Sequence, residues 1–242
     1  MSSSGNAIAD GFEAVNRELV ACRRCPRLVE WRERCAREKR AAFRDQEYWG
    51  RPVPGFGDPA ARLLVLGLAP AAHGGNRTGR IFTGDRSGDW LFACLWRTGF
   101  ANQPTSVARG DGLALRDCYV TAPVKCAPPD NSPLIQERDE CAPWLERELA
   151  LLPGVRVVVA LGSYAWDAAL RHLGPVRPKP RFGHGAEAGL PGDRVLLASY
   201  HVSQQNTLTK RLTEPMLDSV FLRARQLLQT RPAERGSSAD LP

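Results

Sequence analysis

Four short apolar runs constrain the fold of this chain more than any other feature of its sequence. They span residues 62–68, 117–122, 155–161 and 194–200. Short runs that are apolar throughout are typical of β-strands buried on both faces, and the third run is also rich in β-branched valine. We therefore expect four buried strands.

Segments with helical character lie between and around these strands. We expect helices over residues 87–97, 132–151, 163–174 and 214–228, with one or two more within residues 12–44. Pro143 lies inside the second of these segments and should kink the helix or restart it.

Strands that alternate with helices through short connections indicate a mainly parallel sheet covered on both faces. The predicted fold class is therefore α/β, as a three-layer α/β/α sandwich with a mainly parallel, four-stranded central sheet. We expect a single domain over residues 7–230, with residues 1–6 and 231–242 as disordered tails.

The composition is typical of a soluble globular protein. Of the 242 residues, 43% are apolar and 24% are charged. No apolar run approaches the roughly 20 residues needed to cross a bilayer. Residues 1–10 are polar and lack the apolar core of a secretory signal. We therefore expect a cytoplasmic protein without a membrane partner.

The chain is also basic, because 33 Lys and Arg residues against 26 Asp and Glu residues give a formal charge of +7. Such an excess suits a polyanionic partner such as DNA, since each neutralised phosphate releases counterions. Solubility alone would explain the charge equally well.

In a parallel sheet, the loops that bind ligands leave the carboxyl ends of the strands. The expected strands place four loops there, over residues 67–85, 123–133, 162–163 and 201–211. The least ordinary sequence falls in the first, second and fourth of these loops, so we expect the functional residues in them.

Seven cysteines are present, and an odd number in a reducing cytosol does not indicate a disulfide framework. Cys22 and Cys25 form a C-x2-C pair, and Cys126 and Cys141 are separated by 14 residues. Four thiolates could bind an iron–sulfur cluster or a tetrahedral zinc ion. The spacing of the second pair is not that of a zinc ribbon. Alternatively, these four cysteines are small buried side chains that bind no metal. The remaining three cysteines fit this second explanation better: Cys35, Cys94 and Cys118.

Five motifs, taken in order, resemble those of uracil-DNA glycosylases. Residues Gly67–Pro70 resemble the first active-site motif of that family, and Tyr200–Asn206 resemble the second, which contains a histidine. Residues 79–88 and 125–131 match the iron–sulfur branches, and residues 51–58 match the B-type, or family 5, branch. With the four-cysteine layout, the resemblance runs from about residue 22 to residue 228.

The resemblance implies a monofunctional hydrolase that breaks the N-glycosidic bond of uracil in DNA and so initiates base excision repair. It also implies a [4Fe–4S] cluster with a structural role, held by Cys22, Cys25, Cys126 and Cys141. The partner would be double-stranded DNA with a mispaired or damaged base, or single-stranded DNA. We expect the chain to act as a monomer.

Three residues are candidates for catalysis. His201 stands at a strand end, where it could donate a hydrogen bond to the departing base. The B-type pattern assigns Asp85 to the sugar cation and the attacking water, with help from Asn131. Each has a plainer explanation: a structural histidine for His201, a helix cap for Asp85 and turn chemistry for Asn131.

The base-binding pocket that the resemblance implies consists of Gly67, Ala69, Ala71 and Phe82. A flipped base would stack on the ring of Phe82, which could otherwise be a core residue. Other branches carry an acidic residue where this chain has Ala69, a bulky aromatic where it has Ala71, and Asn where it has Ala122. The smaller residues predict a roomier pocket that also accepts hypoxanthine, xanthine and modified pyrimidines.

The segment from Ser203 to Arg211 is polar and then basic, and we interpret it as a wedge that enters the DNA. An ordinary solvated loop is the alternative. The residues expected to contact DNA are Asn76, Arg77, Arg80, Ser203, Gln204, Gln205, Asn206, Lys210 and Arg211.

Two other functions remain open at this point. A non-catalytic DNA-binding protein whose cysteines hold zinc would have the same composition and charge. A thiol enzyme that uses Cys126 near His201 would need a lowered cysteine pKa.

Overall fold

The computed structural model describes residues 3–230, with side chains from residue 8 onward, and its centre is a six-stranded sheet. The strand order is β1-β3-β2-β4-β6-β5. The four inner strands are parallel and lie where the apolar runs predict: β2 (Leu63–Leu66), β3 (Cys118–Thr121), β4 (Val157–Leu161) and β6 (Arg194–Ser199). The predicted parallel core of the sheet is therefore confirmed.

Two short antiparallel strands, which the sequence did not predict, extend this core at its edges. Strand β1 (Phe56–Gly57) pairs with β3, and β5 (Glu187–Leu190) pairs with β6. The sheet is thus two strands wider than predicted, and each parallel edge is covered by a short strand.

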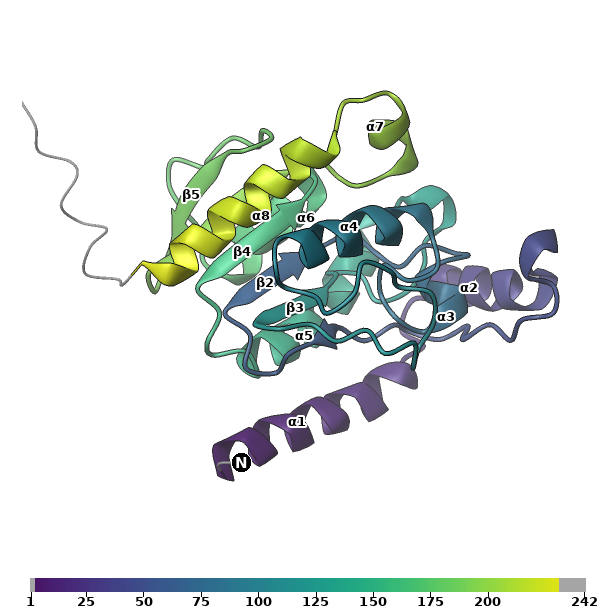
Figure 1. The fold of residues 1–242 in the computed structure, drawn as a ribbon. Coiled ribbons are helices and arrows are strands. Elements are labelled where there is room, and N and C mark those ends of the chain that lie inside the picture. The colour runs from purple at the N-terminus through teal and green to yellow at the C-terminus, as the bar shows by residue number, and fades with distance from the viewer. Residues whose placement is uncertain (1–2, 231–242) are drawn as a thin grey trace, which may run out of the picture.

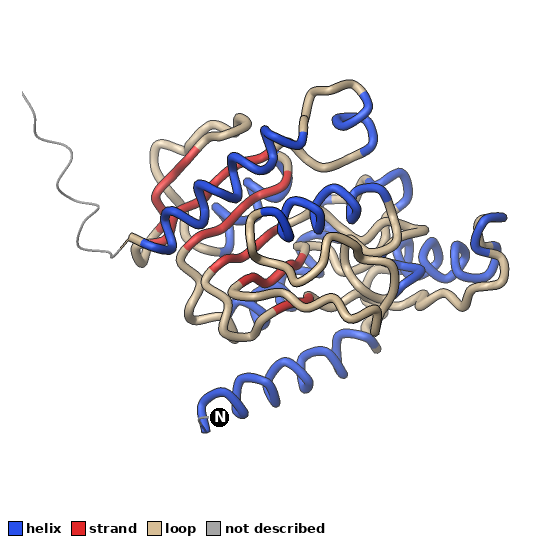
Figure 2. The backbone as a smooth tube through the Cα atoms, in the orientation of Figure 1, coloured by secondary structure: helices blue, strands red, loops and turns tan. Residues whose placement is uncertain are grey.

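Helices cover both faces of the sheet, so the predicted three-layer sandwich is confirmed (Figure 1). Helices α4 (Arg86–Arg97) and α8 (Glu214–Gln229) lie on one face, and Figure 2 shows them in front of the strands. Helices α1 (Ser3–Val20), α5 (Ile135–Ala150) and α6 (Ser163–His172) contribute to the apolar cluster on the other face. The bounds of α4, α6 and α8 agree with prediction within two residues.

Alternation along β4 explains the two apolar layers. Val157, Val159 and Leu161 belong to the cluster that contains α4 and α8, whereas Val158 and Ala160 belong to the cluster that contains α5 and α6. All five side chains are fully buried. Burying a valine or leucine side chain contributes about 1.5–3 kcal/mol, so the sheet is stabilised from both faces.

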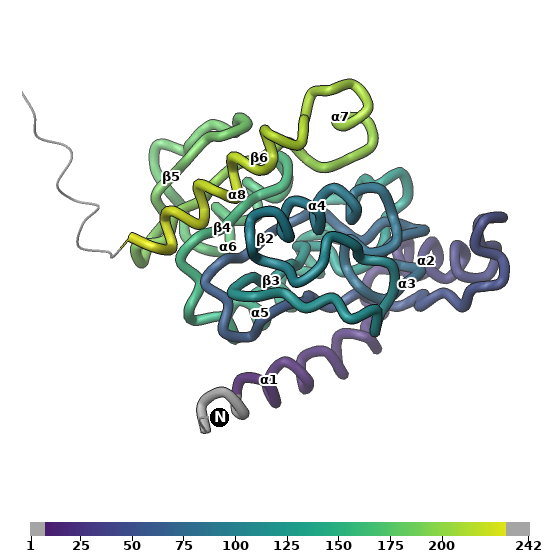
Figure 3. Tube along the Cα trace, viewed as in Figure 1, coloured from purple at the N-terminus to yellow at the C-terminus, as the bar shows by residue number. Residues whose placement is uncertain are grey.

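Five further helical elements complete the described fold, and three of them lie in the loops that follow β2, β3 and β6. The five are α2 (Pro26–Glu38), η1 (Ala41–Phe43), α3 (Gly75–Thr78), η2 (Pro129–Asn131) and α7 (Gln204–Leu208). Helix α2 packs beside α3, although the two are far apart in sequence, as the colours of Figure 3 show.

Two details differ from the sequence predictions. Helix α1 already begins at Ser3, so residues 3–6 are helical and not a disordered tail. Residues 1–2 and 231–242 lie outside the described residues. Helix α5 runs through Pro143 and does not restart there.

Within the described part of the chain, no helix combines the length and the apolar character that crossing a membrane requires.

Candidate active site

The loops after the four parallel strands meet at one edge of the sheet, as the sequence predicts. The amide of Gly67, after β2, donates to the carbonyl of Thr121, the last residue of β3 (2.8 Å). The amide of Gly162, after β4, donates to the carbonyl of Ser199, the last residue of β6 (2.8 Å). The first motif is thereby fixed to its neighbouring strand.

Phe82 lies over the first motif in a strained conformation. Its φ of 51° is in the left-handed region, which a bulky side chain rarely adopts, and such strain is concentrated at functional sites. A Cβ on Gly67 would lie 2.7 Å from Cε2 and Cζ of the Phe82 ring. Only glycine at position 67 therefore lets the ring lie this close to the backbone of the first motif.

His201 faces the same ring. The centroids of the Phe82 and His201 rings are 6.2 Å apart, with their planes tilted by 36°. Burial lowers the pKa of His201 to about 4, so the imidazole is neutral at pH 7. The side chain of Asn206 donates to the carbonyl of His201 (2.8 Å), which ties this residue to the start of α7.

Asp85 caps helix α4, so the plainer explanation of this residue is confirmed. Its Oδ1 accepts from the amide of Gly88 (3.0 Å). Its other oxygen, Oδ2, lies against Gly74 in the first active-site loop, where a Cβ would come within 1.7 Å of it. Burial raises the pKa of Asp85, while the amides of Gly88 and Ser87 oppose the rise. The carboxylate therefore both caps the helix and faces the first loop.

Ala69 and Ala71 are partly buried in that first loop. Ala69 packs against a cluster formed by Leu28, Val124 and Cys126, so the first motif lies directly beside the cysteines. The carbonyl of Ala71 accepts from the amide of Asn76 (3.0 Å).

Asn131 stands on the exposed turn η2, and its side chain forms no hydrogen bond with another described residue. Asn131 and the preceding Asp130 both have positive φ values, 53° and 52°. Two consecutive left-handed non-glycine residues are costly, so the turn is held in a strained form. The turn chemistry expected for Asn131 is therefore present.

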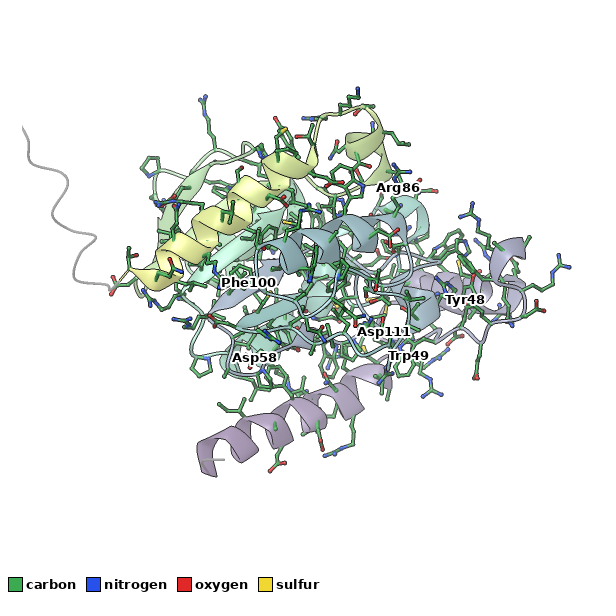
Figure 4. All side chains as sticks on the ribbon, viewed as in Figure 1. Tyr48, Trp49, Asp58, Arg86, Phe100 and Asp111 are labelled. Carbon is green, nitrogen blue, oxygen red and sulfur yellow. The ribbon has the colours of Figure 1, made fainter. Side chains whose placement is uncertain are left out.

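The prediction that Arg80 contacts DNA is wrong, because this side chain is buried. Its guanidinium forms an ion pair with Asp111 (2.6 Å; Figure 4 labels Asp111) and donates to Thr83 and Ser106 (both 2.9 Å). Only 5% of Arg80 is exposed. The residue anchors the loop that carries Phe82.

The predictions for Asn76 and Arg77 are wrong for the same reason. Asn76 is fully buried, and its amide nitrogen donates to the carbonyl of Arg32 (3.1 Å). The guanidinium of Arg77 donates to the carbonyls of His73 (2.7 Å) and Gly84 (2.6 Å). These polar side chains support the loops from the inside.

The segment around α7 is exposed, as a DNA-contacting wedge requires. Ser203 caps α7 by accepting from the amide of Asn206 (3.4 Å). The other predicted contacts are exposed to solvent: Gln204, Gln205, Lys210 and Arg211. Leu208, which sequence reasoning did not single out, is 63% exposed in the same segment. An isolated exposed leucine carries a weak sequence signal, because single exposed apolar residues are common.

Cys22, Cys25, Cys126 and Cys141 line one cavity, which is also bordered by α1 and α2. Burial, with the negative charge of Cys126 and Cys22, raises the pKa of Cys25 to about 11. The four predicted ligands are therefore brought together, although they come from three separate segments of the chain.

Two buried donors around the cavity suit a hydrogen-bond acceptor. Among the described residues, no three His, Cys, Asp or Glu side chains converge closely enough to hold a single metal ion. Arg32 and Trp144 line the cavity, and the buried nitrogens Arg32 Nε and Trp144 Nε1 have no hydrogen-bond partner among the described residues. Unpaired buried donors favour an acceptor in the cavity.

The structure does not support the thiol-enzyme alternative. Burial raises the pKa of Cys126, whereas a nucleophilic cysteine needs a lowered pKa. Its sulfur accepts from the guanidinium of Arg32 (2.9 Å). Sequence reasoning missed Arg32, because its partner stands 94 residues away in the chain.

Comparison with known proteins identifies the family. The model of the uracil DNA glycosylase superfamily matches residues 54–225. A type-5 uracil-DNA glycosylase of Mycobacterium tuberculosis is 56% identical over 215 residues, covering 88% of this chain and 80% of the relative. One of Thermus thermophilus is 55% identical, covering 89% and 97%, and one of Pyrobaculum aerophilum is 51% identical, covering 87% and 90%. The chain therefore belongs to the uracil-DNA glycosylase superfamily and, within it, to the type-5 uracil-DNA glycosylases.

Proposed function

We propose that the chain is a monofunctional glycosylase that hydrolyses the N-glycosidic bond of uracil in DNA and initiates base excision repair. The names of its type-5 relatives support this reaction. The observation that carries the proposal is the neutral imidazole of His201 opposite the ring of Phe82 at the carboxyl edge of the sheet. Phe82 offers a surface on which an extruded base can stack. His201 offers a hydrogen-bond donor to the negative charge that develops on the base as it leaves.

His201 acts on the leaving base. Cleavage of the bond leaves negative charge on the base, and a fixed N–H donor stabilises that charge most when little water competes. The lowered pKa keeps the ring neutral, so it donates a hydrogen bond without first having to lose or gain a proton. The base itself stacks on Phe82, whose ring lies against the backbone of Gly67.

Asp85 acts on the sugar. Positive charge develops there, and a carboxylate nearby stabilises it and orients the attacking water, as carboxylates do in the hydrolysis of other glycosidic bonds. One oxygen of Asp85 is held by the cap of α4, and the other faces the first loop. Asn131 assists from the strained turn at η2, where its amide could hold the same water.

Small residues around the pocket extend the substrate range to hypoxanthine, xanthine and modified pyrimidines. Ala69 and Ala71 present only methyl groups on the first loop, and Ala122 after β3 is 1% exposed. None of these side chains can hydrogen-bond a base edge or block a bulky substituent. The pocket therefore selects bases by the ease of flipping, which is greatest for a mispaired or damaged base.

The reaction is hydrolytic, without an amine nucleophile. Lys125 lies near the site but is buried in an ion pair with Glu148 and also donates to Thr121 (both 2.5 Å). These contacts hold the amine among buried side chains, away from the sugar.

The exposed segment from Ser203 to Arg211 enters the DNA beside the flipped base. Leu208 supplies an apolar wedge between base steps, and Lys210 and Arg211 bind phosphates. The substrate is DNA that is double-stranded around a mispaired or damaged base, or single-stranded DNA. The chain binds it as a monomer.

The cysteine cavity holds a [4Fe–4S] cluster bound by Cys22, Cys25, Cys126 and Cys141. When bound, such a cluster joins the N-terminal helices to the loop after β3 and to α5, which is a structural role. The unpaired donors Arg32 Nε and Trp144 Nε1 support an anionic occupant. A zinc-containing, non-catalytic DNA-binding protein is the alternative. A brown protein with iron and inorganic sulfide supports the cluster, and a colourless protein with one zinc ion contradicts it.

A single-turnover assay tests the reaction itself. Uracil, hypoxanthine, xanthine and ethenocytosine are placed in one duplex context and in the matching single strand. We expect base release and alkali-labile abasic sites, without strand cleavage before alkali. Release of uracil alone would contradict the broad specificity, and release of no base would contradict the function.

A further inference from the structure

Arg32, in the middle of α2, is buried among the cysteines. Only 2% of the residue is exposed. Its Nη1 donates to the sulfur of Cys126 (2.9 Å), and its Nη2 donates to the carbonyl of Cys22 (3.0 Å). One guanidinium thus joins two cysteines that are about a hundred residues apart in the sequence.

No carboxylate among the described residues binds the guanidinium of Arg32. Among the described residues, no ion pair includes Arg32, and its Nε has no hydrogen-bond partner. The nearest acidic side chain along the helix, Glu33, is instead bound by Arg23. A buried, unpaired guanidinium strongly destabilises a fold. The folded protein therefore needs a negative charge beside Arg32.

The remaining contacts of Arg32 do not explain its charge. Its backbone carbonyl accepts from Asn76 in α3, and this bond would form with any side chain at position 32. Among the described residues, the hydrogen bonds of the guanidinium go to Cys126 and Cys22, and Arg32 lines the cavity that the cysteines share.

We propose that Arg32 is the counter-ion of the cysteine-bound cluster and sets its resistance to oxidation. The inference rests on the cofactor assigned under the proposed function. A positive charge and a hydrogen bond at a ligand sulfur stabilise the state with more electron density on that sulfur. Losing an electron is then harder, and the reduction potential of the cluster rises.

The test compares Arg32→Met, Arg32→Gln and Arg32→Lys with a matched control, Arg24→Met. Arg24 lines the same cavity and also carries one positive charge, but it is exposed and lies over the ring of Trp144. All chains are purified without oxygen, and iron and inorganic sulfide are counted per chain. The readouts are the rate of bleaching in ferricyanide, which takes an electron from the cluster, and the midpoint of that oxidation.

We expect Arg32→Met to bleach about tenfold faster or more than the parent, with a lower midpoint, because the loss of a partner to a metal ligand typically has effects of this size. Arg32→Lys should fall between the two, since it keeps the charge but cannot span Cys126 and Cys22. Arg24→Met should match the parent.

Equal bleaching rates and oxidation midpoints in the parent and in an Arg32→Met protein with the same iron and sulfide content would overturn this inference. The cofactor assignment would stand. An equal shift in Arg24→Met would also overturn it, because any nearby charge would then suffice. If Arg32→Met does not fold, Arg32→Gln and Arg32→Lys decide by the same readouts. A parent chain without iron or sulfide would overturn the cofactor assignment and this inference together.

Discussion

Oδ2 of Asp85 lies so close to Gly74 that a Cβ on the glycine would come within 1.7 Å of it. The contact joins the start of α4 to the first active-site loop. Gly74→Ala should therefore push the carboxylate away from its position. Because a misplacement of about 1 Å at a reacting group can slow a reaction on the order of a hundredfold, we expect a loss of this size in the single-turnover rate.

Gly183→Ala is the matched control, since a Cβ at Gly183 would meet nothing within 4 Å. It should cleave uracil at the parent rate. A Gly74→Ala protein that cleaves as fast as this control would show that the position of Asp85 is not critical.

The sequence was sufficient to predict the elements that are buried on both faces. The valine-rich run of β4 is apolar at every position because both neighbouring layers cover it. The edge strand β5 (Glu187–Leu190) was missed because only Leu190 is buried in it. It has no long apolar run, and its pairing with β6 cannot be inferred from local sequence.

Within the site, the candidate residues that the structure brings together stand directly after strand ends or in the loops that follow them, where topology alone places them side by side. His201 and Phe82 are examples. Arg80 was predicted to contact DNA, but it is buried against Asp111, which comes from a loop 31 residues later. Long-range ion pairs of this kind leave no local pattern in the sequence.

The pH dependence of cleavage should report Asp85. Burial raises the pKa of this carboxyl above its ordinary value of 3.8, and the ionised form is the active one. The rate should therefore fall as the pH falls through this raised pKa. His201 has a pKa of about 4 and stays neutral above that value. Its titration should therefore cause no separate fall in the cleavage rate at pH 5–6.

Single-turnover rates of the parent and of His201→Asn over pH 4–8 check this assignment, and both should share the same acidic limb. Asp85→Asn keeps a side chain that can cap α4, so the protein should remain folded. Its rate should be low on every base and should lack the limb. An unchanged rate in Asp85→Asn would leave helix capping as the whole role of the residue.

Replacing single cysteines by alanine should distinguish the cysteines that bind the cluster from those that only pack in the core. Cys22→Ala and Cys141→Ala should give colourless, poorly folded protein, because the cavity then lacks one of its four thiolates. Cys94→Ala should keep the visible absorbance, since Cys94 is a buried core residue of α4 and does not line the cysteine cavity. Iron content and absorbance of the three variants check this, and equal iron in all three would contradict the ligand assignment.

Binding to DNA should weaken steeply with salt, and part of that dependence should come from the segment after α7. Lys210 and Arg211 are both exposed there. Replacing both by alanine should reduce the slope of log K against log salt by about one unit for each phosphate that the protein no longer neutralises. Leu208→Ala is the comparison, because it removes an apolar side chain without changing charge. An unchanged slope in the double variant would remove this segment from the interface.

Loss of His201 should affect cleavage according to the leaving base. The imidazole lies opposite Phe82, with ring centroids 6.2 Å apart, where it can donate to a stacked base. Removing one such donor typically slows a reaction on the order of 10²–10³-fold. His201→Ala should reach this loss with uracil and hypoxanthine, whose anions need the most stabilisation. Xanthine leaves more readily and should lose less. Equal losses on all three bases, measured under single turnover, would mean that His201 shapes the pocket and does not stabilise the departing base.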